Sequence, residues 1–171
     1  MNEKIIKTSN ELELGKAGEY YAIFKIMKQG FVAYPSDQGL PYDVVVDIGG
    51  RLLRGQIKST RGISDYGKMK SVYRWGTRSA KKTVRATRAS STDFYAFVAI
   101  DDELVAFMAT SEIISKKNPE SVNQCVEMRN KNIVIPGRSY PNGTIRKACF
   151  GRYVEDYQSF ERVERIINAK V

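Results

Sequence analysis

The chain has 171 residues, of which 28 are lysine or arginine and 19 are aspartate or glutamate, so its formal net charge is +9. This length allows one domain with a sizeable core, and 42% hydrophobic residues are typical of a globular protein. There is no apolar run of about 18 residues and no signal-peptide pattern, so we expect a cytoplasmic protein that does not cross a membrane. Histidine is absent, which excludes histidine-based nucleophile pairs and histidine zinc sites.

The first predicted element is a helix from Asn10 to Gln29. Its apolar residues recur at three- and four-residue steps, and Gly30 is placed to end it. The recurring residues are Leu14, Ala17, Tyr21, Phe24 and Met27. Glu19 lies off this stripe, at the border of the predicted buried face. Two interpretations stay open for Glu19: a carboxylate of a functional site, or a solvated side chain that pairs with a lysine such as Lys16.

A short strand is expected at 31–34, and a β-hairpin follows at 42–58. Two consecutive glycines at its centre are typical of a two-residue hairpin turn. With only these glycines in the turn, Asp43 lies opposite Gln56, and strand alternation puts Lys58 on the same face as Gln56. The hairpin therefore gathers a carboxylate, a carboxamide and an ammonium at one end of its polar face. The alternative is an ordinary solvated hairpin face.

The stretch after the hairpin changes composition abruptly. Between Arg61 and Thr92 nine residues are basic and one is acidic, a net charge of +8. We predict a loop excursion that becomes ordered on a polyanion, with a basic helix at 78–88 as an alternative for part of it. Basic side chains neutralise phosphates, and arginines can also read base edges. The candidate DNA-binding residues are Arg61, Lys68, Lys70, Tyr73, Arg74, Trp75, Arg78, Lys81, Lys82, Arg85 and Arg88.

The two aromatic residues in this set have two interpretations. Tyr73 and Trp75 could stack on bases or sugars, or they could anchor the excursion to the core. The remaining elements, in chain order, are a hairpin with strands 94–100 and 104–109, a short helix at 111–116, an irregular segment at 118–143 with a candidate strand at 133–135, and a helix at 155–169. Together these elements predict an α/β or α+β fold, with a central mixed sheet flanked by helices.

Three motifs in order resemble the PD-(D/E)XK nuclease superfamily: Glu19 on a first helix, Pro41-Tyr42-Asp43 opening a strand, and Gln56-Ile57-Lys58 on the next. The segments 15–19 and 93–100 are also similar to its small single-domain members, and the resemblance covers 14–112. It implies a restriction-endonuclease-like core. The chain departs from the family pattern by an inserted Tyr42 and by Gln56 in place of an acid. A Gln-x-Lys motif is similar to that of intron-encoded homing endonucleases.

Cutting a phosphodiester by this route needs a divalent metal, and we expect Mg2+ or alternatively Mn2+. Asp43, Gln56, Glu19 and the backbone carbonyl of Ile57 are the expected oxygen ligands. Lys58 would position the nucleophile or steady the developing charge. The expected catalytic set is therefore Glu19, Asp43, Gln56 and Lys58.

These expectations combine into a sequence-specific, double-strand DNA endonuclease resembling the homing endonucleases. We expect one nuclease domain over 1–171, with a core at 10–116, a basic excursion at 59–92 and a C-terminal extension at 117–171. Cutting two antiparallel strands calls for two active sites, so we expect a homodimer or homotetramer, nucleoid-associated when bound to DNA, with its interface in the extension. The alternatives are a restriction, repair or junction-resolving nuclease of the same fold, and a non-catalytic nucleic-acid-binding module.

Overall fold

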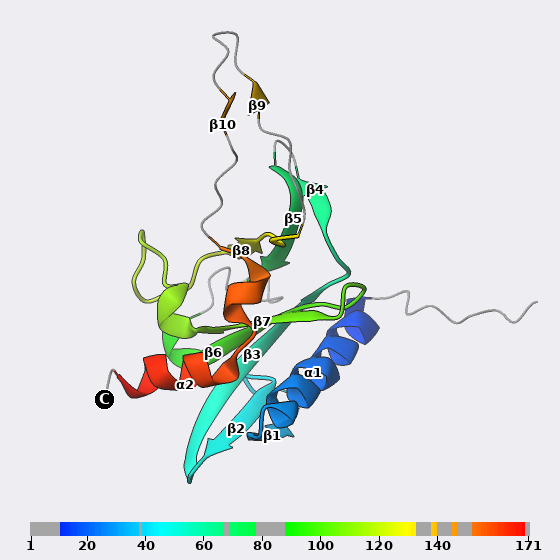
Figure 1. The fold of residues 1–171 in the computed structure, drawn as a ribbon. Coiled ribbons are helices and arrows are strands. Elements are labelled where there is room, and N and C mark those ends of the chain that lie inside the picture. Colours follow the sequence, from blue (N-terminus) through cyan, green and yellow to red (C-terminus); the bar gives the residue numbers. More distant parts are fainter. Residues whose placement is uncertain are drawn as a thin grey trace, which may run out of the picture.

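The computed structural model describes residues 11–37, 39–66, 69–77, 88–132, 138–139, 145–146 and 152–169. At its centre lies a five-stranded sheet with the order β1-β2-β3-β6-β7 (Figure 1). These strands are β1 (Val32–Pro35), β2 (Val44–Ile48), β3 (Arg51–Thr60), β6 (Phe94–Ala99) and β7 (Leu104–Ala109). The β3–β6 pair is parallel and the other neighbours are antiparallel. The predicted central mixed sheet is confirmed.

The β2–β3 hairpin has the predicted register. Val44 pairs with Gly55 and Ile48 pairs with Arg51, so the turn consists of Gly49-Gly50 alone. Both glycines have positive φ, 60° and 90°, which is the backbone of a two-residue turn that twists with its strands. Val44 and Val46 are buried on one face, and the other face of the hairpin carries Gln56 and Lys58.

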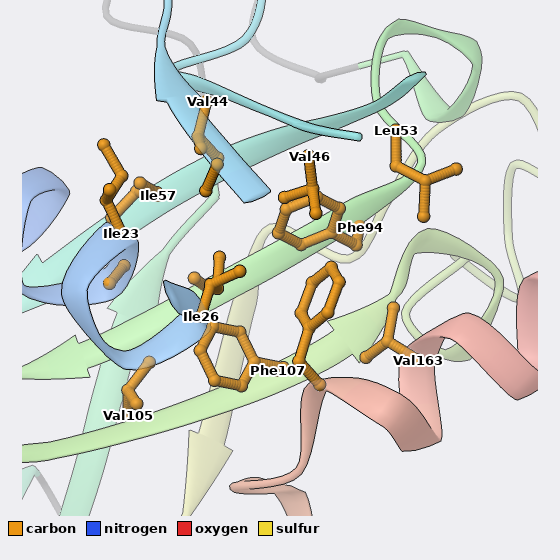
Figure 2. Packing of buried hydrophobic residues seen from close by; sticks show 14 of the residues in the cluster. Ile23, Ile26, Val44, Val46, Leu53, Ile57, Phe94, Val105, Phe107 and Val163 are labelled. Atoms are coloured by element: carbon orange, nitrogen blue, oxygen red, sulfur yellow. The ribbon is translucent and has the colours of Figure 1, made fainter. Parts of the chain in front are cut away.

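Two helices cover the buried face of the hairpin and of the central sheet. The helices are α1 (Glu11–Lys28) and α2 (Phe160–Asn168). Figure 2 shows side chains of both helices in one cluster with those of the strands: Ile26 of α1 and Val163 of α2 belong to the same cluster as Phe94 and Phe107. The Phe160 ring packs edge-on against Phe94, with ring centroids 4.9 Å apart. This contact fixes α2 to the strands that carry the first core.

The C-terminal helix is shorter than predicted. The expected helix at 155–169 is divided into a 3-10 turn, η3 (Val154–Tyr157), and α2. The Phe160 backbone N–H at the start of α2 donates to Gln29 Oε1 at 2.7 Å, and Gln29 Nε2 donates to the Gln158 carbonyl at 3.1 Å. Because Gln29 satisfies backbone groups at this point, the chain changes direction there without leaving them unpaired.

The opposite face of the sheet is covered by a second, three-stranded sheet with the order β4-β5-β8. Its strands are β4 (Ser64–Tyr66), β5 (Met69–Gly76) and β8 (Cys125–Met128). Tyr73, Trp75 and Met128 are buried there against Phe97 of β6. The prediction of a loop excursion at 59–92 and of an irregular segment at 118–143 is therefore wrong for β4, β5 and β8, because burial of the aromatic side chains outweighs the local excess of charge.

Smaller elements complete the description. They are η1 (Ala89–Ser91), η2 (Thr110–Glu112), β9 (Arg138–Ser139) and β10 (Ile145–Arg146), and β9 pairs with β10. Instead of the helix expected at 111–116, only the 3-10 turn η2 forms. The candidate helix at 78–88 lies, except for its last residue, outside the described residues, as does the candidate strand at 133–135. Among the helices of the described residues, none is long and apolar enough to cross a membrane.

Candidate active site

The candidate site lies where β2 begins and β3 continues beyond it. Asp43 directly precedes β2, and its N–H donates to the Gly55 carbonyl at 2.8 Å. Two residues further along β3, the Ile57 N–H donates to Asp43 Oδ2 at 2.7 Å. The Asp43 carboxylate thus accepts the backbone N–H that a further residue of β2 would otherwise pair with. Since the N–H and C=O of one strand residue face the same neighbour, the Ile57 carbonyl lies on this side as well.

Gln56 and Lys58 flank this contact on the polar face of β3. Gln56 Nε2 donates to Asp43 Oδ2, the oxygen that also accepts the Ile57 N–H. Neither of these two bonds uses Oδ1. Lys58 is partly buried and its charge acts on Asp43. The sequence prediction that these three polar side chains share one end of the hairpin is borne out by the register and the hydrogen bonds.

Burial governs the electrostatics of the site. Burial raises the pKa of the Asp43 carboxyl above its ordinary value, although the Ile57 N–H and the Lys58 ammonium oppose this and the Glu19 charge adds to it. Burial lowers the pKa of Lys58, and Asp43 opposes that shift. Each charged group therefore lies in a place that disfavours its charge, as is frequent at functional sites.

Glu19 reaches the site because α1 approaches β3 closely. At Gly18 a Cβ would lie 1.8 Å from Ser59 Oγ, so only glycine allows this contact. The neighbouring Glu19 is close enough that its charge raises the pKa of Asp43. Glu19 Oε2 also forms an ion pair with Lys16 Nζ at 2.7 Å. The ion pair with Lys16 is thus present, and Glu19 also lines the same cleft as Asp43, while its role as a carboxylate of a functional site stays a prediction.

A cleft of about 580 Å³ opens between α1 and the loop before β2. Its lining residues are Glu13, Gly15, Lys16, Glu19, Ser36, Asp37, Gly39, Leu40, Tyr42 and Asp43. Asp43 is one of these lining residues, and its Oδ2 accepts hydrogen bonds from Gln56 and Ile57 of β3. A substrate in the cleft would therefore meet Glu19 and Asp43 together.

The donors present suit a hard divalent cation. The described residues contain no group of three or more His, Cys, Asp or Glu side chains able to hold a metal. The site instead offers the carboxylates of Glu19 and Asp43, the amide oxygen of Gln56 and the carbonyl of Ile57. Magnesium binds oxygen ligands, keeps several waters and needs only one or two protein carboxylates. The donor set fits such an ion, with Gln56 contributing a neutral oxygen.

Three of the candidate DNA-binding arginines are described. Arg61 is exposed and lies 4.0 Å from Asp101, measured from Nη1 to Oδ1. Arg74 is partly buried, and its Nε lies 3.5 Å from Glu127 Oε1 across the β5–β8 pair. Arg88 is exposed, and its backbone forms an isolated antiparallel β-bridge with Ser121. Arg61 and Arg88 therefore present charge at the surface at the two ends of the basic stretch.

The aromatic candidates are not available to DNA. Tyr73 and Trp75 are each 1% exposed, and Trp75 Nε1 donates to the Val98 carbonyl at 2.8 Å. Stacking on bases is thus excluded for both, and the alternative prediction, anchors in the core, is correct. Lys70 belongs to β5, while the other candidates lie outside the described residues: Lys68, Arg78, Lys81, Lys82 and Arg85.

Sequence reasoning missed the role of Gly18. The available signal was a glycine inside a helical pattern, which destabilises a helix by about 1 kcal/mol relative to alanine and therefore points to a packing reason. The partner in that contact, Ser59, lies 41 positions away on β3 and could not be identified from the pattern.

Comparison with known proteins shows the family and the fold of this chain. Residues 9–133 match the family model described as PD-(D/E)XK endonuclease, a range that contains Glu19, Asp43, Gln56 and Lys58. The fold is similar to the solved structure of a bacterial homing endonuclease, I-Ssp6803I, with a TM-score of 0.62 and 17% identity over 95% of this chain and 96% of that one. No curated protein matches the chain in sequence. The fold is thus restriction-endonuclease-like.

Proposed function

The chain belongs to the PD-(D/E)XK endonuclease family, and from this premise we propose that it hydrolyses phosphodiester bonds of double-stranded DNA with a divalent metal. The observation that carries the proposal is that Gln56 Nε2 and the Ile57 N–H both donate to Oδ2 of Asp43. The charges of Glu19 and Lys58 also act on this carboxylate. The net charge of +9 supports a polyanionic substrate. The similarity of the fold to that of a bacterial homing endonuclease supports the proposal that cleavage is sequence-specific.

Four groups would hold the metal, Mg2+ or Mn2+: the side chains of Asp43, Gln56 and Glu19 and the carbonyl of Ile57. When bound, such an ion polarises the phosphate and lowers the pKa of a coordinated water. The hydrogen bond from the Ile57 N–H fixes the orientation of the Asp43 carboxylate before any ligand arrives. The protein therefore pre-organises this carboxylate instead of ordering it during the reaction.

Lys58 would act on the attacking water or on the phosphate. Because burial lowers the pKa of its ammonium, Nζ gives up a proton more readily than that of an exposed lysine, although the charge of Asp43 opposes this shift. In its charged form Nζ would steady negative charge that develops on the phosphate oxygens. Both roles place Lys58 in contact with the reacting groups.

Recognition and assembly extend the proposal. Arg61 and Arg88, together with the basic residues between them, would contact the DNA, and base contacts by arginines would supply sequence specificity. Two copies of the chain would be needed to cut both strands, as a homodimer or homotetramer. Phe160 and Val163 of α2 are buried in the core of their own chain, so the proposed interface in the C-terminal extension would use other residues.

One observation favours a second candidate, a DNA-binding module without catalysis. Gln56 stands where the family carries an acid, and this lowers the negative charge available to a metal. Cleavage of a large, sequence-diverse DNA pool in Mg2+ or Mn2+ separates the two functions. Asp43→Asn and Lys58→Met test the site, and Asp47→Asn on the same hairpin face is the matched control because it lies near the turn.

The expected result is a discrete set of fragments with the wild type and with Asp47→Asn, and none with either site variant. Fragments that persist with Asp43→Asn would place the chemistry elsewhere. DNA binding without cleavage by the wild type in both metals would support the binding module.

A further inference from the structure

Lys16 lines the cleft, but neither a catalytic nor a metal-binding role is assigned to it above. It is the basic residue among the described residues that line the cleft, and its side chain is 46% exposed. Its Nζ lies 2.7 Å from Glu19 Oε2 and 5.5 Å from the centre of the Tyr20 ring. It therefore stands beside a proposed metal ligand and is accessible to solvent.

The cleft is acidic although the chain is strongly basic. The same lining contains four carboxylates, those of Glu13, Glu19, Asp37 and Asp43. A phosphate that approaches Asp43 through this cleft meets repulsion from like charge, and Lys16 is placed to offset it. The negative charge of Asp43 also acts on Lys16, because it is one of the charges that raise the pKa of the Lys16 ammonium.

We propose that Lys16 is a phosphate-binding residue that exchanges partners. In the free protein it pairs with Glu19; when DNA and metal bind, it moves to a backbone phosphate and releases Glu19 for the metal. The inference rests on the proposed function, because the released carboxylate serves the proposed metal site. It assigns a new role to Lys16 and a reason for its place one helical turn before Glu19.

The exchange is physically easy. The Lys16–Glu19 pair is solvent-accessible, and such pairs contribute little to stability. The lysine precedes the glutamate, which is the less stabilising order along a helix. The ammonium therefore loses little when it leaves Glu19, whereas a phosphate beside a crowded set of carboxylates gains a needed counter-charge.

Binding of duplex DNA without metal tests the proposal apart from cleavage. A synthetic duplex is titrated in EDTA at several salt concentrations with wild type, Lys16→Ala, Lys16→Arg and Lys25→Ala. Lys25 is the matched control: it lies on the same helix and its Nζ sits 5.2 Å from the Tyr21 ring centre, but it does not line the cleft. Lys16→Ala should lower the affinity roughly three- to tenfold at low salt and reduce the salt slope by about 1, while Lys16→Arg and Lys25→Ala keep it.

A double-mutant cycle tests the exchange itself. Glu19→Gln should raise the metal-free DNA affinity by releasing Lys16, and this gain should disappear in Lys16→Ala/Glu19→Gln. A gain that survives in the double variant would mean that Glu19 repels DNA by itself, and would overturn the exchange. An equal loss in Lys16→Ala and Lys25→Ala would overturn the specific role of Lys16. Binding without any cleavage by the wild type removes the proposed function alone, and absence of binding overturns both.

Discussion

The contact between Gly18 and Ser59 predicts that a single methyl group on α1 will damage the site more than the fold. In Gly18→Ala the added Cβ would lie 1.8 Å from Ser59 Oγ and 2.9 Å from Ser59 Cβ. Ser59 belongs to β3, which is paired with β6 at this position, so the strand cannot easily move. The helix is therefore expected to shift away from the sheet and to carry Glu19 with it.

The magnitude follows from the size of the overlap. Ordinary contacts between heavy atoms need about 3.5 Å, so α1 would move by about 1 to 2 Å near Glu19. Overpacking of this kind destabilises by about 1–3 kcal/mol, but alanine recovers about 1 kcal/mol of helix propensity. The net loss of folding free energy should thus be about 0–2 kcal/mol. A misplacement of about 1 Å at a site can reduce the rate about 100-fold.

A second substitution separates the steric cause from other effects. Ser59→Gly removes both Oγ and Cβ, and the next atom near the added methyl group is Val98 Cβ at 3.7 Å, an ordinary contact. The double variant Gly18→Ala/Ser59→Gly should therefore recover most of the rate that Gly18→Ala loses, when it is compared with Ser59→Gly. Ser59→Ala alone should be neutral for stability, since Ser59 Oγ is buried without a hydrogen-bond partner.

Single-turnover cleavage and urea unfolding monitored by circular dichroism measure the two effects separately. We expect Gly18→Ala to lose about two orders of magnitude in rate with a small change in unfolding free energy. A rate close to that of the wild type would refute the argument that this contact positions Glu19. An equal loss in the single and the double variant would refute the steric explanation.

Three further predictions concern the site, the second core and the start of α2. Because burial raises the pKa of Asp43, the folded protein holds the proton of this carboxyl more tightly than the unfolded chain does. The stabilisation of the fold by this proton is present below the unfolded pKa and is lost as the pH rises through the folded pKa. Asp43→Asn should therefore raise the unfolding temperature at pH about 7, and the gain should vanish below pH about 3.9; a gain that stays constant with pH would contradict this. Trp75→Phe should destabilise the fold, as it removes the hydrogen bond to Val98, and leave DNA affinity unchanged in a binding titration; a loss of affinity in the folded variant would contradict a purely structural role for Trp75. Gln29→Ala should lower the unfolding free energy by about 0.5–2 kcal/mol in urea, because the Phe160 N–H loses its partner; no change would mean that water replaces the glutamine.

The parts of the fold that the sequence predicts are those with local signals. The two glycines at 49–50 set the register of the hairpin, and this register alone places Asp43 opposite Gln56. The β6–β7 pair was predicted because its two apolar runs are separated by a short acidic turn. The resemblance to PD-(D/E)XK nucleases, read from the order of these same elements, is confirmed by the family match.

The parts that the sequence does not predict depend on distant partners. Tyr73 pairs with Met128 across the β5–β8 ladder, and nothing in the charged stretch around Tyr73 indicates that strand. The break before α2 depends on Gln29, which lies 131 positions from Phe160. In the site, the role of Gly18 needs the position of Ser59. Local patterns therefore predict strands and registers, while the close contacts that set the position of α1 come from packing.

The start of β2 at Val44, one residue after Asp43, has a consequence for how this site can change over evolution. Asp43 supplies Oδ2 to a backbone N–H that any residue at position 57 would offer, so the sheet itself restricts replacement of the aspartate. Gln56 contributes only its side chain, and an acid or an amide can occupy that place without altering the backbone. Substitution at the position of Gln56 should therefore be tolerated more easily than substitution of Asp43. A sequence pattern that demands an acid there would overlook relatives of this kind, whereas one that pairs the aspartate with the register of the hairpin would find them.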